Sequence, residues 1–212
     1  MEDYKYDVFI SYERDGLTTG WITEHFLPHF RTWVRMEIEG ICKRKSLPLF
    51  FDSSQTDPNF PTDLKQKVEG IKPGANWDNA LRDAIRASRC MVGIWNPPYF
   101  YSDWCNLEWQ SFDRRADKTG RDVLLAASVH DGSSFPKKAA ARQCLDFSSY
   151  VLFGPALTNS KIYVDFQQAV KLLAHHVALS VSEAPPFESW PLAEDIPEPP
   201  PPPPIDVSAV RF

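Results

Sequence analysis

The chain has 212 residues, a net charge of -5 and an aromatic content of 13%. This length suits one well-packed core and is too short for two large ones, while the aromatic content excludes wholesale disorder. The acidic balance argues against a nucleic-acid partner, which would need a basic surface. The N-terminal MEDYKYDVFI has no export signal, and no apolar run approaches the roughly 18 residues of a membrane span. We therefore expect a cytoplasmic protein with no membrane partner.

The first part of the chain predicts two strands separated by a long helix. Residues 6–12 are rich in β-forming residues without polar alternation, which is typical of a strand covered on both faces. Apolar residues at three- and four-residue steps from Trp21 predict an amphipathic helix that reaches about Lys45 and that Pro28 kinks or restarts. A second strand is expected at 47–52. An elaborated loop at 53–72 follows, in which 63–69 could form a short helix.

The rest of the chain continues the alternation of helices and strands. A helix is expected from Trp77, a strand at 90–95 that ends before Pro97, and a helix that Ser102 or Asp103 can cap. Strands at 123–129 and 145–147 and a final helix over 162–177 complete the pattern. Such alternation predicts an α/β, flavodoxin-like three-layer fold with a central parallel sheet of about five strands.

The C-terminal segment differs in composition from the rest of the chain. Ten of the 19 prolines lie between Pro185 and Phe212, including the unbroken run 199–204. Such a segment favours extended polyproline II and cannot join a packed core. We place the domain boundary near Ala184, with a domain at 1–184 and an extended or disordered tail at 185–212. Docking of the tail stays open, because residues 205–212 are partly apolar.

Known cofactor motifs are absent from the loops where a parallel sheet binds its ligands. Those loops follow Tyr12, Asp52 and Trp95, and the chain contains neither G-x-G-x-x-G nor G-x-x-x-x-G-K-[ST]. The four cysteines lack C-x-x-C spacing, so we expect reduced, structural thiols. His25 and His29 have the spacing of a metal pair but no evident third ligand. We expect no metal and no cofactor.

Five motifs, in this order along the chain, resemble the Toll/interleukin-1 receptor (TIR) domain. They are Y-D-V-F-I-S-Y-x-R-D-G at 6–16, F-F-D at 50–52, P-G-x-x-W at 73–77, A-I-x-A-S-R at 84–89, and the set Tyr99, Ser102, Trp104, Cys105 and Glu108. The resemblance covers residues 6 to 180. The chain looks more like prokaryotic TIR proteins, including NAD-cleaving enzymes of Thoeris-like anti-phage defence, than like receptor tails.

The resemblance implies that Glu108 is catalytic, because NAD-cleaving TIR domains carry their essential glutamate in a W-x-x-x-E element that here spans 104–108. NAD is then a substrate rather than a cofactor. Nicotinamide leaves as a neutral molecule, so one carboxylate that stabilises a cationic ribose can suffice. Trp104, one helical turn from Glu108, could stack on a base or nicotinamide ring, or could simply belong to the core.

Other family positions suggest contacts with the substrate. Arg14 is the candidate for a pyrophosphate contact, although it could be an ordinary surface arginine. Tyr12, Trp77 and Asn96 occupy positions that line the same cleft in the family, although Trp77 could only pack its helix on the sheet. Two departures from the family are the 20 residues between Asp52 and Pro73 and an acid-base pair, Glu13 and Arg14, in place of two basic residues.

Several functional alternatives remain open from the sequence. The product could be ADP-ribose, a cyclic isomer or a conjugate, and a downstream effector could sense it. Homo-oligomerisation through TIR surfaces is implied by the resemblance. A non-catalytic scaffold that acts by TIR–TIR association is the competing hypothesis. A response-regulator receiver is excluded, because Trp95-Asn96 stands where its phospho-accepting Asp should be.

Overall fold

The computed structural model describes residues 3–14, 16–55, 62 and 68–195. Its centre is a parallel sheet with the strand order β2-β1-β3-β4-β5, the order of flavodoxin-like folds. The strands are β1 (Tyr6–Tyr12), β2 (Leu49–Phe50), β3 (Ser88–Trp95), β4 (Leu124–Ser128) and β5 (Cys144–Asp146). The predicted α/β class and five-strand parallel sheet are confirmed.

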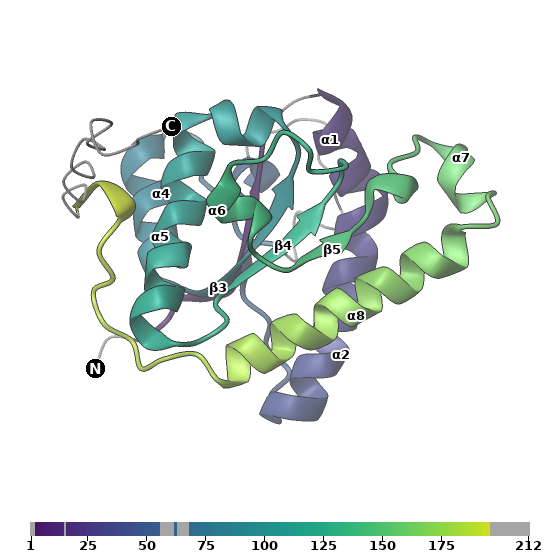
Figure 1. The fold of residues 1–212 in the computed structure, drawn as a ribbon. Helices are drawn as coiled ribbons and strands as arrows, with labels where there is room; N and C mark the ends of the chain where they lie inside the picture. The colour runs from purple at the N-terminus through teal and green to yellow at the C-terminus, as the bar shows by residue number, and fades with distance from the viewer. Residues whose placement is uncertain (1–2, 15, 56–61, 63–67, 196–212) are drawn as a thin grey trace, which may run out of the picture.

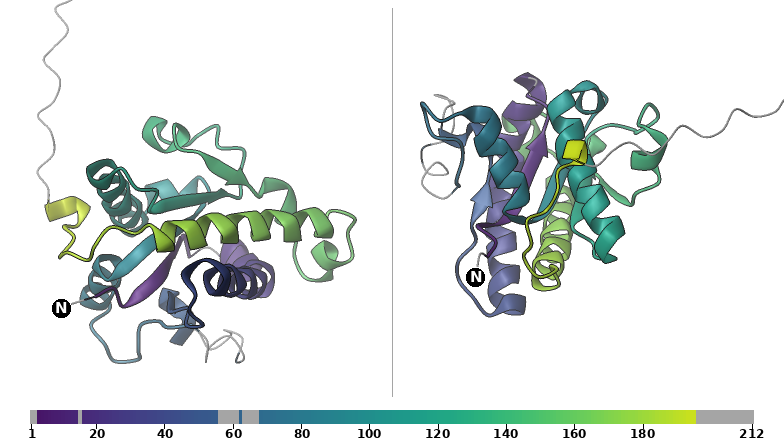
Figure 2. Two further views of the ribbon diagram at one scale, coloured as in Figure 1. Left: turned by 90° about the horizontal axis from the view of Figure 1, so that it is seen from below. Right: turned by 90° about the vertical axis from the view of Figure 1, so that its left-hand side faces the viewer.

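Helices cover both faces of the sheet (Figures 1 and 2). Helices α4 (Trp77–Arg86) and α5 (Asp103–Thr119) pack on one face. On the other face, α8 (Tyr163–Ser182) crosses the strands and lies side by side with α2 (Leu27–Cys42). Shorter helical pieces are α1 (Gly16–Trp21), η2 (Asp52–Gln55), η3 (Pro98–Tyr101), α6 (Lys137–Ala140), η4 (Ser148–Tyr150) and α7 (Pro155–Thr158).

Pro28 is accommodated by a π-helical turn. The turn η1 (Ile22–Phe26) joins α1 to α2, and the Leu27 N–H donates to the Ile22 carbonyl in the i to i+5 pattern. Pro28, which has no N–H, lies in the first turn of α2, so the expected restart is confirmed. The predicted end near Lys45 is wrong. The helix ends at Cys42 because Lys43 adopts the left-handed conformation with φ 56°.

The second strand is shorter than the six residues expected from the sequence. Only Leu49–Phe50 pairs with β1, and Phe50 also forms an isolated bridge with Glu69. The Phe51 N–H donates to the Glu69 carbonyl at 2.8 Å. Glu69 is therefore bridged to the sheet edge and not helical, while 63–67 of the predicted short helix lie outside the described residues. Gly70 fits here because a Cβ would stand 2.6 Å from the Phe51 carbonyl oxygen.

The C-terminal segment 185–195 returns along the outer face of α5 (Figure 2). Trp190 is buried, the cations of Arg115 and Lys118 both lie over its ring, and its indole N–H donates to the Tyr4 hydroxyl at 3.0 Å. The Ala193 N–H, at the start of η5 (Ala193–Asp195), donates to Ser111 Oγ at 2.9 Å. The boundary predicted near Ala184 thus separates α8 from a segment that packs on the domain, and the proline run lies outside the described residues.

None of the described helices combines the length and apolarity that crossing a bilayer requires. The core instead lies between the helices and the sheet, where the largest buried side chains are aromatic. Trp95, the last residue of β3, and Phe112 of α5 are fully buried. The Phe112 ring packs against Phe9 of β1, and the Trp95 ring packs against Tyr99.

Candidate functional site

Glu108 lies in the second turn of α5 and is only 6% exposed. Ser11 of β1 donates a hydrogen bond to its Oε2 atom. The Ser11 Oγ is also 2.5 Å from the hydroxyl oxygen of Tyr99, which η3 places in full burial. The side chain therefore faces the sheet rather than bulk solvent, near the carboxyl end of β1. This is the edge at which parallel sheets place their ligands.

Burial raises the pKa of Glu108 to about 8, because the charged form loses its hydration. The hydrogen bond from Ser11 and the nearby Arg14 lower this pKa, and the charge of Asp52 raises it. Burial therefore favours the protonated form of Glu108 in the free domain, an effect that the residue spacing in the helix could not indicate.

Four of the predicted binding residues form one contiguous cluster around Asp52. The Tyr12 hydroxyl donates to Asp52 Oδ1 at 2.9 Å, and Arg14 forms an ion pair with Oδ2. The Arg14 guanidinium lies 5.1 Å from the ring centre of Trp77, which meets Trp104 edge to face at 4.7 Å. The loops after β1 and β2 and the first turns of α4 and α5 therefore converge, as the sequence analysis expected.

Arg14 and Asn96 both form hydrogen bonds with other residues of the protein. The Arg14 Nε also donates to Asp52 at 3.1 Å, so its guanidinium is directed at a carboxylate in the free domain. Asn96 Nδ2 donates to Thr18 Oγ1 at 3.0 Å, and its Oδ1 accepts the Tyr99 N–H at 2.9 Å. These contacts fix the start of η3 and hence the position of Tyr99. Asn96 is only 6% exposed, which gives it a structural part in the site.

Sequence analysis missed three residues that organise this site, namely Ser11, Tyr99 and Asp52. Each stood inside a motif quoted for the resemblance, yet none carried a distinctive spacing. A serine within a buried strand and a tyrosine after two prolines look like packing residues. The signal that could have identified Ser11 is its place as the next-to-last residue of a buried parallel strand, where a polar side chain needs a partner.

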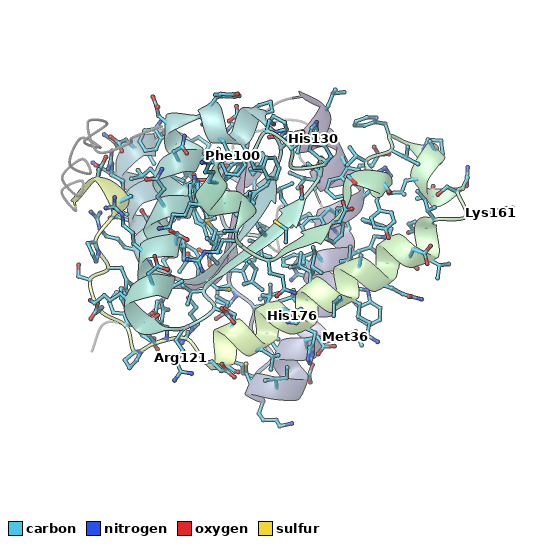
Figure 3. The ribbon with its side chains drawn as sticks, in the orientation of Figure 1. Met36, Phe100, Arg121, His130, Lys161 and His176 are labelled. Atoms are coloured by element: carbon cyan, nitrogen blue, oxygen red, sulfur yellow. The ribbon has the colours of Figure 1, made fainter. Side chains whose placement is uncertain are left out.

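A separate cavity of about 300 Å³ lies at the opposite edge of the sheet. Arg121, which precedes β4, and His176 of α8 belong to its lining, and both are labelled in Figure 3 well away from Phe100 of η3. The lining combines leucines with charged groups, and Arg142 there already pairs with Asp113 and Asp117. This cavity is therefore distinct from the site around Glu108.

Comparison with known proteins identifies the family. The family model described as the TIR domain matches residues 8–169, most of the chain. The chain belongs to the TIR domain family. The matched region of this TIR domain contains every candidate site residue, from Ser11 to Glu108, and ends before the C-terminal segment 185–195. Helix α8 is matched only in its first turns.

Comparison with solved structures also finds a chain that is similar to this one. The TIR domain is similar to the TIR domains in a structure titled as the activated Roq1 resistosome directly recognizing the pathogen effector XopQ. The identity is 18%, 80% of this chain and 84% of that chain are covered, and the TM-score is 0.38. A search of curated proteins finds no match.

Proposed function

We propose that this TIR domain cleaves the bond between nicotinamide and ribose in NAD, with Glu108 as the essential carboxylate. The observation that supports this most is the placement of Glu108. It is a buried carboxyl group at the ligand-binding edge of the sheet, one helical turn from an indole ring that is only partly buried. Burying a carboxyl group costs free energy, so a glutamate without a function is usually found at the surface.

The chemistry matches what the site contains. The bond between the ribose C1′ and the pyridinium nitrogen breaks, and its electron pair returns to the ring, so nicotinamide leaves neutral without a general acid. The ribose becomes an oxocarbenium-like cation that a carboxylate beside it stabilises. In hydrolysis a water oxygen bonds to C1′ and a proton is released, which gives ADP-ribose, nicotinamide and one proton.

Substrate binding supplies the charge change that Glu108 needs. The nicotinamide ring of NAD carries a positive charge, and an opposite charge within a few ångströms favours the ionised carboxylate. Binding therefore lowers the pKa of Glu108 from about 8 and releases its proton to solvent. Because the carboxyl group is covered in the free domain, the side chains above it have to shift to admit the ribose.

The aromatic cluster supplies contacts for the rest of the substrate. Trp104 and Trp77 offer ring faces and edges for stacking, and Arg14 is half exposed, so its guanidinium can turn from Asp52 to the pyrophosphate. We propose that water, or a nucleophile within NAD itself, completes the reaction, which gives ADP-ribose, a cyclic isomer or a conjugate. By resemblance to prokaryotic TIR enzymes, the product serves as an anti-phage signal for a downstream effector.

Self-association belongs to the proposal, because TIR enzymes often complete the site with a loop of a neighbouring subunit. Specific activity should then rise with protein concentration or with a crowding agent. A specific activity that stays constant from dilute to concentrated protein, where light scattering reports assembly, would contradict this part of the proposal.

Incubation with NAD, followed by mass spectrometry of the products, tests the function. The wild type should release nicotinamide, and Glu108→Gln should lose nearly all of that activity while keeping the fold. Glu37→Gln is the matched control, because Glu37 pairs with His175 on the far side of the sheet. Equal NAD loss with wild type and Glu108→Gln, or none with either at high protein concentration, would favour the scaffold hypothesis.

A further inference from the structure

Two buried polar side chains connect to Glu108 by hydrogen bonds. Ser11 is 1% exposed, and Tyr99 is fully buried. The Ser11 hydroxyl contacts both Glu108 and the Tyr99 hydroxyl. Neither can touch a substrate in these positions. Their polar atoms need another explanation, because buried polar groups without a partner are costly.

The contact between Ser11 and Glu108 decides which way the hydrogens point. A serine hydroxyl carries one hydrogen, and that of Ser11 is donated to Glu108 Oε2. The hydrogen in the 2.5 Å contact between the Ser11 and Tyr99 hydroxyl oxygens therefore comes from Tyr99. Tyr99 donates to Ser11, and Ser11 donates to Glu108.

The neighbouring backbone makes room for the ring that packs against Tyr99. Gly93 lies two residues before Trp95 on β3 and directly opposite Ser11 on β1. A Cβ at position 93 would stand 2.4 Å from the Trp95 Nε1. Glycine at this position therefore leaves space for the Trp95 ring, whose centre lies 6.4 Å from that of Tyr99.

We propose that Tyr99 and Ser11 form a one-directional chain of hydrogen-bond donors that ends at Glu108 and holds its carboxylate ready as the acceptor. Tyr99 and Ser11 are then positioning residues. The chain offsets part of the desolvation of Glu108 and orients the carboxylate oxygens when the ribose cation forms. Its part in catalysis rests on the proposed function, but its effect on Glu108 does not.

Other ionisable groups also act on Glu108 and have to be kept constant in any test. Arg14 favours the charged form, and Asp52 and Glu13 disfavour it. The Cys105 thiol and the Tyr99 phenol face the same carboxyl group, and burial keeps both protonated. The variants below leave Arg14, Asp52, Glu13 and Cys105 unchanged. A change in the titration of Glu108 can therefore be traced to the donor chain.

The test is a titration of Glu108 by carbon-13 NMR of its side-chain carboxyl group, assigned with Glu108→Gln. Ser11→Ala removes the direct donor and should raise the titration midpoint by about one to two pH units, the usual worth of a hydrogen bond to a charged group. Tyr99→Phe keeps the ring and should raise it by about half that amount. Tyr163→Phe, whose hydroxyl contacts His29 on the other face of the sheet, should leave it unchanged.

The outcomes separate this inference from the proposed function. Unchanged midpoints in both Ser11→Ala and Tyr99→Phe would overturn the donor chain, whatever the enzyme does. If Ser11→Ala does not fold, Tyr99→Phe alone decides, because phenylalanine has the same shape as the tyrosine ring. Failure of the wild type to cleave NAD would refute the proposed function and leave the NMR result intact. Where NAD is cleaved, the pH profile of kcat/KM should move with the NMR midpoint.

Discussion

Replacing Glu108 by glutamine should make the domain increasingly more stable than the wild type as the pH rises. The folded-state pKa of Glu108 is about 8, against an ordinary value of 4.5. A raised pKa means that the folded state holds a proton that the unfolded state has lost, so this contribution is complete below about pH 4.5 and declines towards pH 8. Each pH unit within this window costs the wild type up to about 1.4 kcal/mol.

The size of the effect follows from the same two pKa values. Between pH 5 and pH 7, the wild type should lose about 2.5 kcal/mol of unfolding free energy through Glu108, and Glu108→Gln should lose none by this route. Urea unfolding of both proteins at pH 5, 6 and 7 measures the difference, and titrating groups distant from Glu108 cancel in the comparison. A difference that stays constant over this range would show that Glu108 is ionised in the free domain, and the reasoning would fail.

The remaining predictions concern the site and the C-terminal segment. For NAD cleavage at limiting substrate, kcat/KM should rise with pH and level off above about 8, and Asp52→Asn should move this midpoint down, because the Asp52 charge raises the pKa of Glu108. Trp104→Ala should weaken ADP-ribose binding about tenfold in calorimetry, and Trp104→Phe should weaken it less, if the indole stacks on a base. Trp190→Ala should lower unfolding free energy by about 3 kcal/mol in a urea titration, because it empties a buried indole site.

The sequence was sufficient for the fold because its signals were local and repeated. Apolar strands such as 6–12 and helices with three- and four-residue periodicity predicted the alternation that the parallel sheet confirms. The second strand was overestimated for a physical reason. Residues 47–52 have strand composition, but only Leu49–Phe50 finds a partner on β1, and Phe51 turns its N–H to Glu69 instead. Composition reports propensity, whereas pairing depends on distant partners.

The sequence predicted the identity and position of some site residues, but not their hydrogen bonds or their pKa values. The motif spacing indicated Glu108 and Trp104, and the topology brought Tyr12, Arg14 and Trp77 together as expected. The raised pKa of Glu108 and the identity of its hydrogen-bond partners could not be predicted from the sequence. They depend on contacts between residues 97 and 88 positions apart, which no local pattern encodes.

The contact between Tyr4 and Trp190 joins two residues that are 186 positions apart. Closing such a long loop costs more chain entropy than closing a local contact, unless the intervening elements have already folded and shortened the loop. The segment 185–195 can therefore dock only after β1 and α5 are in place, and it should be among the first parts to detach when the domain unfolds. Amide exchange at Ala193 would then be faster than in β1. Protection of this amide from exchange would therefore report whether β1 and α5 have folded.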